Sequence, residues 1–253
     1  MNVIPEAVLT AKRQALAARK AKTPIEAIRA LASMQKRPQP VLGMVTNGAQ
    51  TLLIGQVCHQ TAEGAYDPVG AGLRMVRAGF DALALFTDDT VYDGGLNDLT
   101  LLARAVNAPV ISQDYVIDEY QVVEARAAGA SGVTLYASIL DVAAQRLLVS
   151  ATQRNRMTAI VQVSSETELT AALAISPQVI ALHIGDHLNV DVLRHLRQQI
   201  PFHVRTLIAH PLSTIEAVQA VASLHADAVL ISGGLCEQPD VVSKLRQILH
   251  HSA

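Results

Sequence analysis

Short apolar segments recur along most of this chain, and a helical pattern follows each of them. They span residues 51–57, 82–86, 109–112, 132–136, 158–163, 179–184, 203–209 and 228–232. Each is apolar at consecutive positions, which is typical of strands buried on both faces of a parallel sheet. A strand followed by a helix, repeated in this way, predicts a closed (β/α)8 barrel, although an open doubly wound sheet has similar local patterns.

The length of 253 residues suits one such barrel. Before the first predicted strand the chain is mostly helical in pattern, with helices expected within residues 5–35. We therefore expect an α/β fold, a single (β/α)8 TIM-barrel domain over residues 1–253, with 1–45 as an N-terminal helical extension. The basic residues of the stretch AKRQALAARKAK are expected to form a solvated helix face.

The composition disfavours several classes of function. The formal net charge is -2, aromatic residues make up 3% and Trp is absent, so neither a basic field nor a stacking surface for nucleic acid is expected. The chain has no continuous apolar run long enough to cross a membrane and no signal-peptide pattern. Two cysteines, Cys58 and Cys236, fit a reducing compartment, so we expect a cytoplasmic protein.

Three stretches resemble one enzyme family. Residues 8–30 (VLTAKRQALAARKAKTPIEAIRA) are similar to its extra N-terminal helices, residues 85–99 (LFTDDTVYDGGLNDL) to its second βα loop, and residues 116–130 (VIDEYQVVEARAAGA) to its third βα unit. They occur in the family's order and at its spacing. The chain therefore resembles indole-3-glycerol phosphate synthase, the barrel enzyme of tryptophan biosynthesis, over essentially its whole length.

The resemblance implies a reaction that depends on charged side chains. The family's substrate is a phosphorylated, anthranilate-bearing ketose, and closing its ring requires an acid that polarises a carbonyl, with loss of carbon dioxide and water. Lysines and glutamates at the C-terminal rim of the barrel supply this chemistry. In this sequence the family's lysine at strand 3 falls on Gln113, its glutamate at strand 5 on Gln162, and an asparagine at strand 6 on His183.

The other rim positions are also neutral. The family's Glu-Ser-Gly at strand 7 falls on Ala209-His210-Pro211. Its Glu-x-Lys at strand 1 falls on residues 55–57 or, with a shift of one residue, on residues 56–58, and neither register contains a lysine. Neutralising a whole set avoids the roughly 3–5 kcal/mol cost of leaving one buried charge unpaired. We therefore expect a neutral, hydrogen-bonding pocket that has lost the synthase reaction.

Some ligand-binding groups could survive without these charges. Backbone N–H groups after the last strand hold phosphate in many barrels, and tyrosines at the rim could pack on an aromatic ligand. Pro211, which has no N–H, weakens the expectation of phosphate binding. The candidate ligand-binding residues are Thr61, Tyr92, Tyr115, Ser232, Gly233 and Gly234.

Three functions stay open. The first is a non-catalytic barrel that binds a small phosphorylated or aromatic molecule, or a protein partner, which includes a second copy of the chain. The second is a lyase with altered chemistry that uses His183, His210, Asp114 and Gln113. The third is an authentic synthase whose lysine comes from elsewhere in the chain.

Other polar residues near the rim have simpler interpretations. Asp88 and Asp89 are expected to brace the loop after the second strand. The histidines His59, His183 and His210 lack the spacing of a zinc site, so we expect no metal ion and no cofactor.

Overall fold

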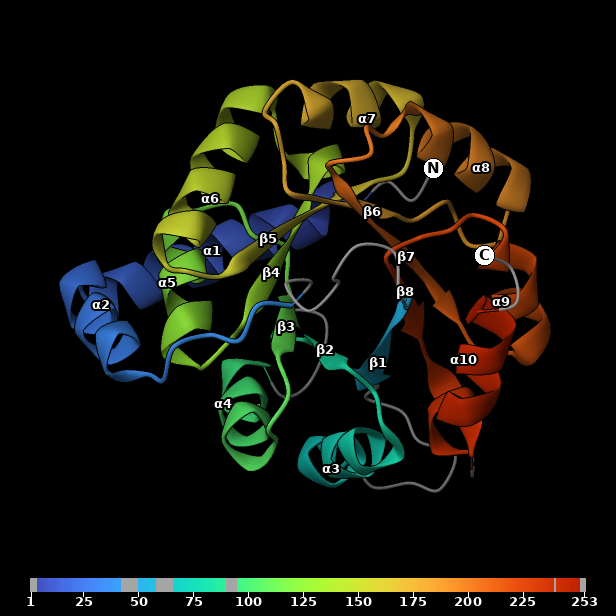
Figure 1. Cartoon of the computed structure of the whole chain (residues 1–253). Coiled ribbons are helices and arrows are strands. Elements are labelled where there is room, and N and C mark those ends of the chain that lie inside the picture. Colours follow the sequence, from blue (N-terminus) through green and yellow to red (C-terminus); the bar gives the residue numbers. More distant parts are fainter. Residues whose placement is uncertain (1–3, 42–49, 58–65, 90–94, 239, 251–253) are drawn as a thin grey trace.

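The computed structural model describes residues 4–41, 50–57, 66–89, 95–238 and 240–250. Its centre is a closed barrel in which eight parallel strands pair in chain order and β1 pairs with β8 (Figure 1). The predicted barrel is confirmed, and the open sheet is excluded. The strands are β1 (Leu52–Val57), β2 (Ala82–Phe86), β3 (Val110–Gln113), β4 (Gly132–Tyr136), β5 (Thr158–Val163), β6 (Val179–Leu182), β7 (Arg205–Leu212) and β8 (Ala228–Ile231).

Helices surround the barrel and alternate with its strands (Figure 1). Several begin at an Asp, Ser, Asn or Thr whose side chain accepts a hydrogen bond from a backbone N–H in the first turn, as at Asp118, Asp141 and Ser165. They are α3 (Pro68–Ala78), α4 (Gly95–Ala105), α5 (Glu119–Ala127), α6 (Val142–Arg154), α7 (Glu166–Leu173), α8 (Val190–Gln199), α9 (Ile215–Ala222) and α10 (Val241–His250). Short 3-10 helices follow β4 (Ala137–Ile139) and β8 (Gly233–Glu237).

Alternate residues of each strand face different cores. In β1, Leu52 and Ile54 belong to the cluster inside the barrel, whereas Leu53 and Val57 belong to the cluster between the barrel and the helices. Gly55 also faces outward, because a Cβ there would lie 2.8 Å from Met75 Sδ and 3.2 Å from Phe80 Cδ1. A glycine therefore lets α3 approach the barrel closely. Gln56 lies between Gly55 and Val57, which face the helices, and therefore points into the barrel near the C-terminal end of β1.

Two helices precede the barrel, as predicted: α1 (Glu6–Lys22) and α2 (Ile25–Met34). They pack beside α5, where Leu16, Ile28 and Ala32 form a small core with Tyr120 and Val123. The Tyr120 hydroxyl lies 3.0 Å from the Thr23 carbonyl oxygen and 3.1 Å from that of Arg19, which fixes the junction between α1 and α2. A single domain over residues 1–253 stays a prediction. Of the helices described, none has the length and apolar character needed to span a lipid bilayer.

Candidate functional site

A cavity of about 210 Å³ opens at the C-terminal ends of the strands. Inward-facing residues at the ends of β1 to β8 form most of its wall, because the alternation within each strand sends every second side chain into the barrel. The described residues that line it carry no Lys, Arg, Asp or Glu: they are Ile4, Gln56, Phe86, Gln113, Tyr115, Tyr136, Ser138, Gln162, Ser164, His183, Ala209, Pro211 and Leu230.

Barrel geometry decides between the two registers at strand 1. Gly55 and Val57 face the helices, whereas Gln56 lines the cavity. The register that places the family's glutamate on Gln56 and its lysine on Cys58 is therefore the one compatible with two inward-facing side chains. Cys58 itself lies outside the described residues.

Two glutamines meet across the floor of the cavity. Gln56 Nε2 donates a hydrogen bond to Gln113 Oε1 at 3.2 Å, and the two side chains are buried. An amide donates and accepts hydrogen bonds without carrying a charge, so this pair satisfies part of the polar surface at two positions that are charged in the family. Gln162, the third predicted glutamine, lines the same cavity from β5.

The two predicted histidines are neighbours: His183 directly follows β6, and His210 lies in β7. Their ring centroids lie 5.6 Å apart, but only His183 is part of the cavity wall. Burial lowers the pKa of His183, and burial together with the charges of His183 and His187 lowers the pKa of His210. Both rings are therefore neutral at pH 7. The third predicted histidine, His59, lies outside the described residues.

The structure places His210 inside β7 rather than after the strand. The pairing of β7 with β8 shifts between Ile208 and Leu212, and the strand continues through Pro211 to Leu212. Ala209 and Pro211 alternate with His210 and line the cavity wall, so the glutamate position of the family at strand 7 holds a small apolar side chain.

An aromatic wall closes one side of the cavity. The rings of Tyr115 and Tyr136 pack at a centroid distance of 5.3 Å with a tilt of 55°, and Phe86 lines the same space. Tyr115 is thus placed where the sequence predicted it. Tyr92, the other predicted tyrosine, lies outside the described residues, as does Thr61.

The segment predicted to bind phosphate begins at the end of β8. Ser232 is buried and precedes the 3-10 helix Gly233–Glu237. Gly233 has a φ of 61°, a left-handed conformation that favours glycine. A Cβ at Gly234 would meet no atom within 4 Å, so its backbone is open to an approaching ligand. Phosphate binding at these residues stays a prediction.

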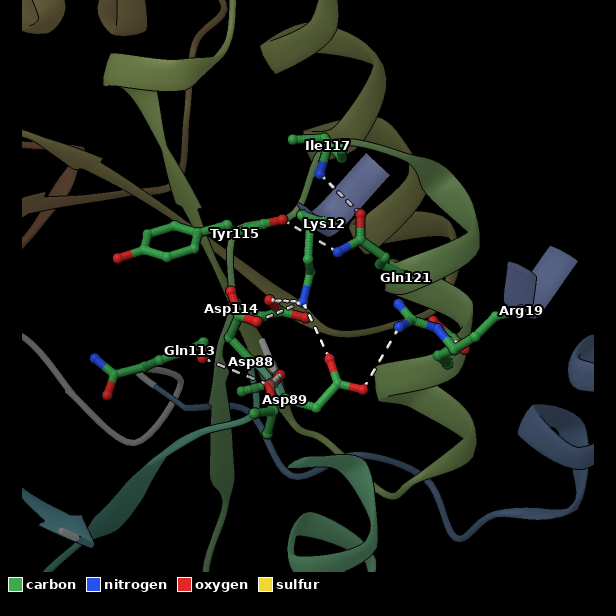
Figure 2. A network of polar contacts seen from close by, with 12 residues as sticks. Lys12, Arg19, Asp88, Asp89, Gln113, Asp114, Tyr115, Ile117 and Gln121 are labelled. Carbon is green, nitrogen blue, oxygen red and sulfur yellow. Dashed lines mark hydrogen bonds and ion pairs between the residues drawn. The ribbon is translucent and has the colours of Figure 1, made fainter. Parts of the chain in front are cut away.

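One feature of the rim was not predicted. Lys12 of α1 is fully buried, and its Nζ lies 2.5 Å from Asp114 Oδ1 and 3.2 Å from Asp88 Oδ1 (Figure 2). The basic stretch of α1 is therefore not simply a solvated face, and Asp88 pairs with the N-terminal extension rather than only bracing its own loop. Lys12 lies on the buried side of α1 with Leu9 and Leu16. The spacing of three and four residues between these positions is the pattern in the sequence that could have predicted the burial of Lys12.

The ion cluster points away from the cavity. Figure 2 shows Gln113 and Tyr115 directed to the other side of the backbone from Asp114 and Lys12. Burial raises the pKa of Asp114, and the neighbouring Lys12 charge opposes this shift. Asp114, which the altered-chemistry hypothesis placed beside the histidines, is absent from the described cavity wall and serves to hold α1.

Known proteins resemble the chain in sequence and in fold. The family model described as indole-3-glycerol phosphate synthase matches residues 6–248. The indole-3-glycerol phosphate synthase of Roseiflexus sp. (strain RS-1) is 29% identical, with 98% of each chain covered. That of Mycobacterium ulcerans (strain Agy99) is 27% identical, over 93% of this chain and 89% of the relative.

Solved structures add evidence for the fold alone. The crystal structure of 3-hexulose-6-phosphate synthase from Salmonella typhimurium superposes with a TM-score of 0.67 at 16% identity, over 80% of this chain and 100% of that one. Family match, full-length relatives and closed barrel agree, so the chain belongs to the indole-3-glycerol phosphate synthase family.

Proposed function

We propose that this chain is a synthase-family barrel that no longer makes indole-3-glycerol phosphate and that binds a small aromatic or phosphorylated molecule at its mouth. One observation carries the proposal: the chain has no lysine between residues 37 and 243. Residues 42–49, 58–65 and 90–94, which lie outside the described residues, also contain no arginine. The strands and the segments between them therefore supply no ammonium group to act as the acid, and the exposed Lys244 lies in α10.

Lys12 is a poor substitute for the missing lysine. Its ammonium is fully buried and in contact with Asp88 and Asp114, on the far side of the backbone from the cavity (Figure 2). Donating a proton to a ligand at the mouth would require it to leave both carboxylates, and these would then remain buried without a counterion. This placement disfavours an authentic synthase that recruits its lysine from the N-terminal extension.

The cavity wall supports binding of a neutral or aromatic group. Tyr115, Tyr136 and Phe86 offer ring surfaces, while Gln56, Gln113 and Gln162 offer amide donors and acceptors. Aromatic faces with a few fixed polar groups are the usual composition of small-molecule sites. An anion could add backbone contacts at Ser232, Gly233 and Gly234, near His210, because backbone donors do not depend on the lost lysines. Thr61, outside the described residues, stays a predicted partner.

A second candidate is a lyase with different acid–base chemistry. It is favoured by the neutral His183, which lines the cavity beside Gln162 and Ser164. A neutral imidazole can accept a proton near pH 7, whereas the surrounding amides and hydroxyls can only orient a substrate. This candidate predicts turnover of some other ligand that disappears when His183 is replaced by Gln.

The direct test is an assay with the family's anthranilate-bearing ketose phosphate. We expect no indole-3-glycerol phosphate, and turnover of about 1 per second or faster would contradict the proposal. Anthranilate and ribose 5-phosphate should raise the unfolding temperature of the parent.

Matched variants locate the binding. Tyr136→Ala should weaken the effect of anthranilate, whereas Phe202→Ala, at a residue that is 95% exposed, should leave it unchanged. Equal effects in the two variants would place the ligand elsewhere.

A further inference from the structure

A second cavity, of about 560 Å³, lies on the outer surface of the barrel. It forms where α2 and the segment after it meet α5 and the C-terminal end of α6, helices that lie side by side in Figure 1. It shares no described residue with the cavity at the mouth. Its walls are formed by Arg29, Ala32, Ser33, Gln35, Arg37, Glu119, Arg126, Arg154, Asn155 and Arg156.

This arginine pocket is strongly basic in a chain whose formal net charge is -2. Glu119 Oε1 is its one lining carboxylate among the described residues, and it is shared by Arg29 at 3.4 Å and Arg154 at 3.2 Å. Within the described ranges no carboxylate forms an ion pair with Arg37, Arg126 or Arg156. The positive charge of the pocket is thus largely uncompensated by the protein.

One of these guanidinium groups is built into the floor. Arg126 is only 8% exposed, and its Nη2 donates to the carbonyl oxygens of Gln35 at 3.1 Å and Lys36 at 2.8 Å. Burial lowers the pKa of Arg126, and the nearby charge of Arg156 adds to this shift. Two backbone carbonyls hold the group in place, so it is oriented before any ligand arrives.

We propose that the arginine pocket binds a small, compact compound with two or more phosphate groups. A guanidinium presents a planar fork of N–H donors that matches phosphate oxygens, and several forks around one space favour a multiply charged ligand. The pocket has the volume of a small-molecule site. No aromatic side chain lines it among the described residues, so it offers no surface on which a nucleotide base could stack.

Inorganic pyrophosphate is the probe, measured by calorimetry on the full chain. The test variant Arg37→Gln/Arg156→Asn removes two arginines that lack a carboxylate partner, and Asn tolerates the φ of 61° at position 156. The control Arg13→Gln/Arg194→Gln removes the same charge from exposed sites paired with Glu6 and Asp191. About a tenfold loss per arginine should weaken Kd about 100-fold in the test variant, against less than about twofold in the control.

Other outcomes would overturn the proposal. Equal pyrophosphate affinity in the two double variants would mean that the anion does not bind at Arg37 and Arg156. Loss of binding in Tyr136→Ala would place the ligand at the mouth. Tighter binding of a hexaglutamate peptide than of pyrophosphate at matched ionic strength would identify an acidic protein segment as the ligand. No pyrophosphate effect beyond that of sodium chloride would leave the pocket without this function.

Discussion

At the scale of single residues, Lys12 has the most consequential environment. A buried ammonium is stable only with counterions, and Asp114 at the end of β3 and Asp88 at the end of β2 provide them. The same contacts hold α1 against the rim. Because Lys12 is the shared counterion of two buried carboxylates, its loss would leave both Asp88 and Asp114 without compensation.

Replacing Lys12 with Met should therefore destabilise the protein by about 3–5 kcal/mol in urea unfolding. The matched control is Lys20→Met, since the Lys20–Asp118 pair has side chains that are 43% and 35% exposed and should contribute less than about 1 kcal/mol. Adding Asp88→Asn and Asp114→Asn to Lys12→Met should recover part of the loss. A loss of equal size for Lys12→Met and Lys20→Met would contradict this view of the cluster.

At the scale of elements, the N-terminal pair of helices is attached to α5 by interactions along its length. Arg19 Nε of α1 donates to Glu124 Oε1 at 3.0 Å, and Gln35 Nε2 after α2 donates to the Ala127 carbonyl oxygen at 2.7 Å. Arg126 of α5 also contacts the extension, because its Nη2 donates to the carbonyl oxygens of Gln35 and Lys36. The extension therefore packs against α5, the helix that follows β3.

The neighbouring ends of β6 and β7 predict how stability responds to pH. Burial lowers the pKa of His183 and His210 below their ordinary value of 6.5, with Asp186 opposing the shift at His183 and His187 adding to it at His210. The unfolded chain therefore takes up protons at a higher pH than the folded chain. Stability should fall as the pH drops from above 6.5 through the lower folded-state values.

Unfolding free energies measured from pH 8 to pH 5 test this linkage, about the range in which histidine titrates. In the variant His210→Gln the loss of stability on acidification should be smaller than in the parent, whereas the variant Phe202→Ala, at an exposed site, should keep the parent's pH dependence. Parallel pH profiles for the parent and His210→Gln would show that this residue does not carry the effect.

At the scale of the whole molecule, closure of the barrel brings side chains of different strands into contact at the rim, so a charge at one position affects the others. Gln56 of β1 and Gln113 of β3 meet through a buried hydrogen bond although 57 positions separate them in the chain. A charge introduced at one of these positions would have no charged partner on the described cavity wall. Neutral residues at the rim must therefore be replaced together.

A double-mutant cycle tests this coupling. Gln113→Lys or Gln56→Glu alone should cost several kcal/mol, about 3–5, because each buries an unpaired charge, while the double variant should cost clearly less than the sum of the two. The free energies come from urea unfolding, with circular dichroism as the check on the fold. Additive losses would mean that the two positions do not interact.

Local patterns in the sequence predicted the elements, and strand pairing then excluded the open sheet that the same patterns allowed. Continuous apolar segments and helical periodicity depend on neighbours along the chain, so they identified eight strands and the N-terminal helices, and motif spacing identified the family. The cavity wall was also partly predictable, since Gln113 and Tyr115 follow a predicted strand and Gln162 and His183 lie near the ends of two others.

Only the tertiary structure decided the rest. The sequence allowed two registers at β1, and the inward position of Gln56 follows from strand pairing around the closed barrel. Lys12 meets Asp88 and Asp114, and the arginine pocket combines α2, α5 and α6, across long separations in the chain. Apolar periodicity shows which face of an element is buried, but it does not show which charge on another element lies opposite. That depends on how the elements pack.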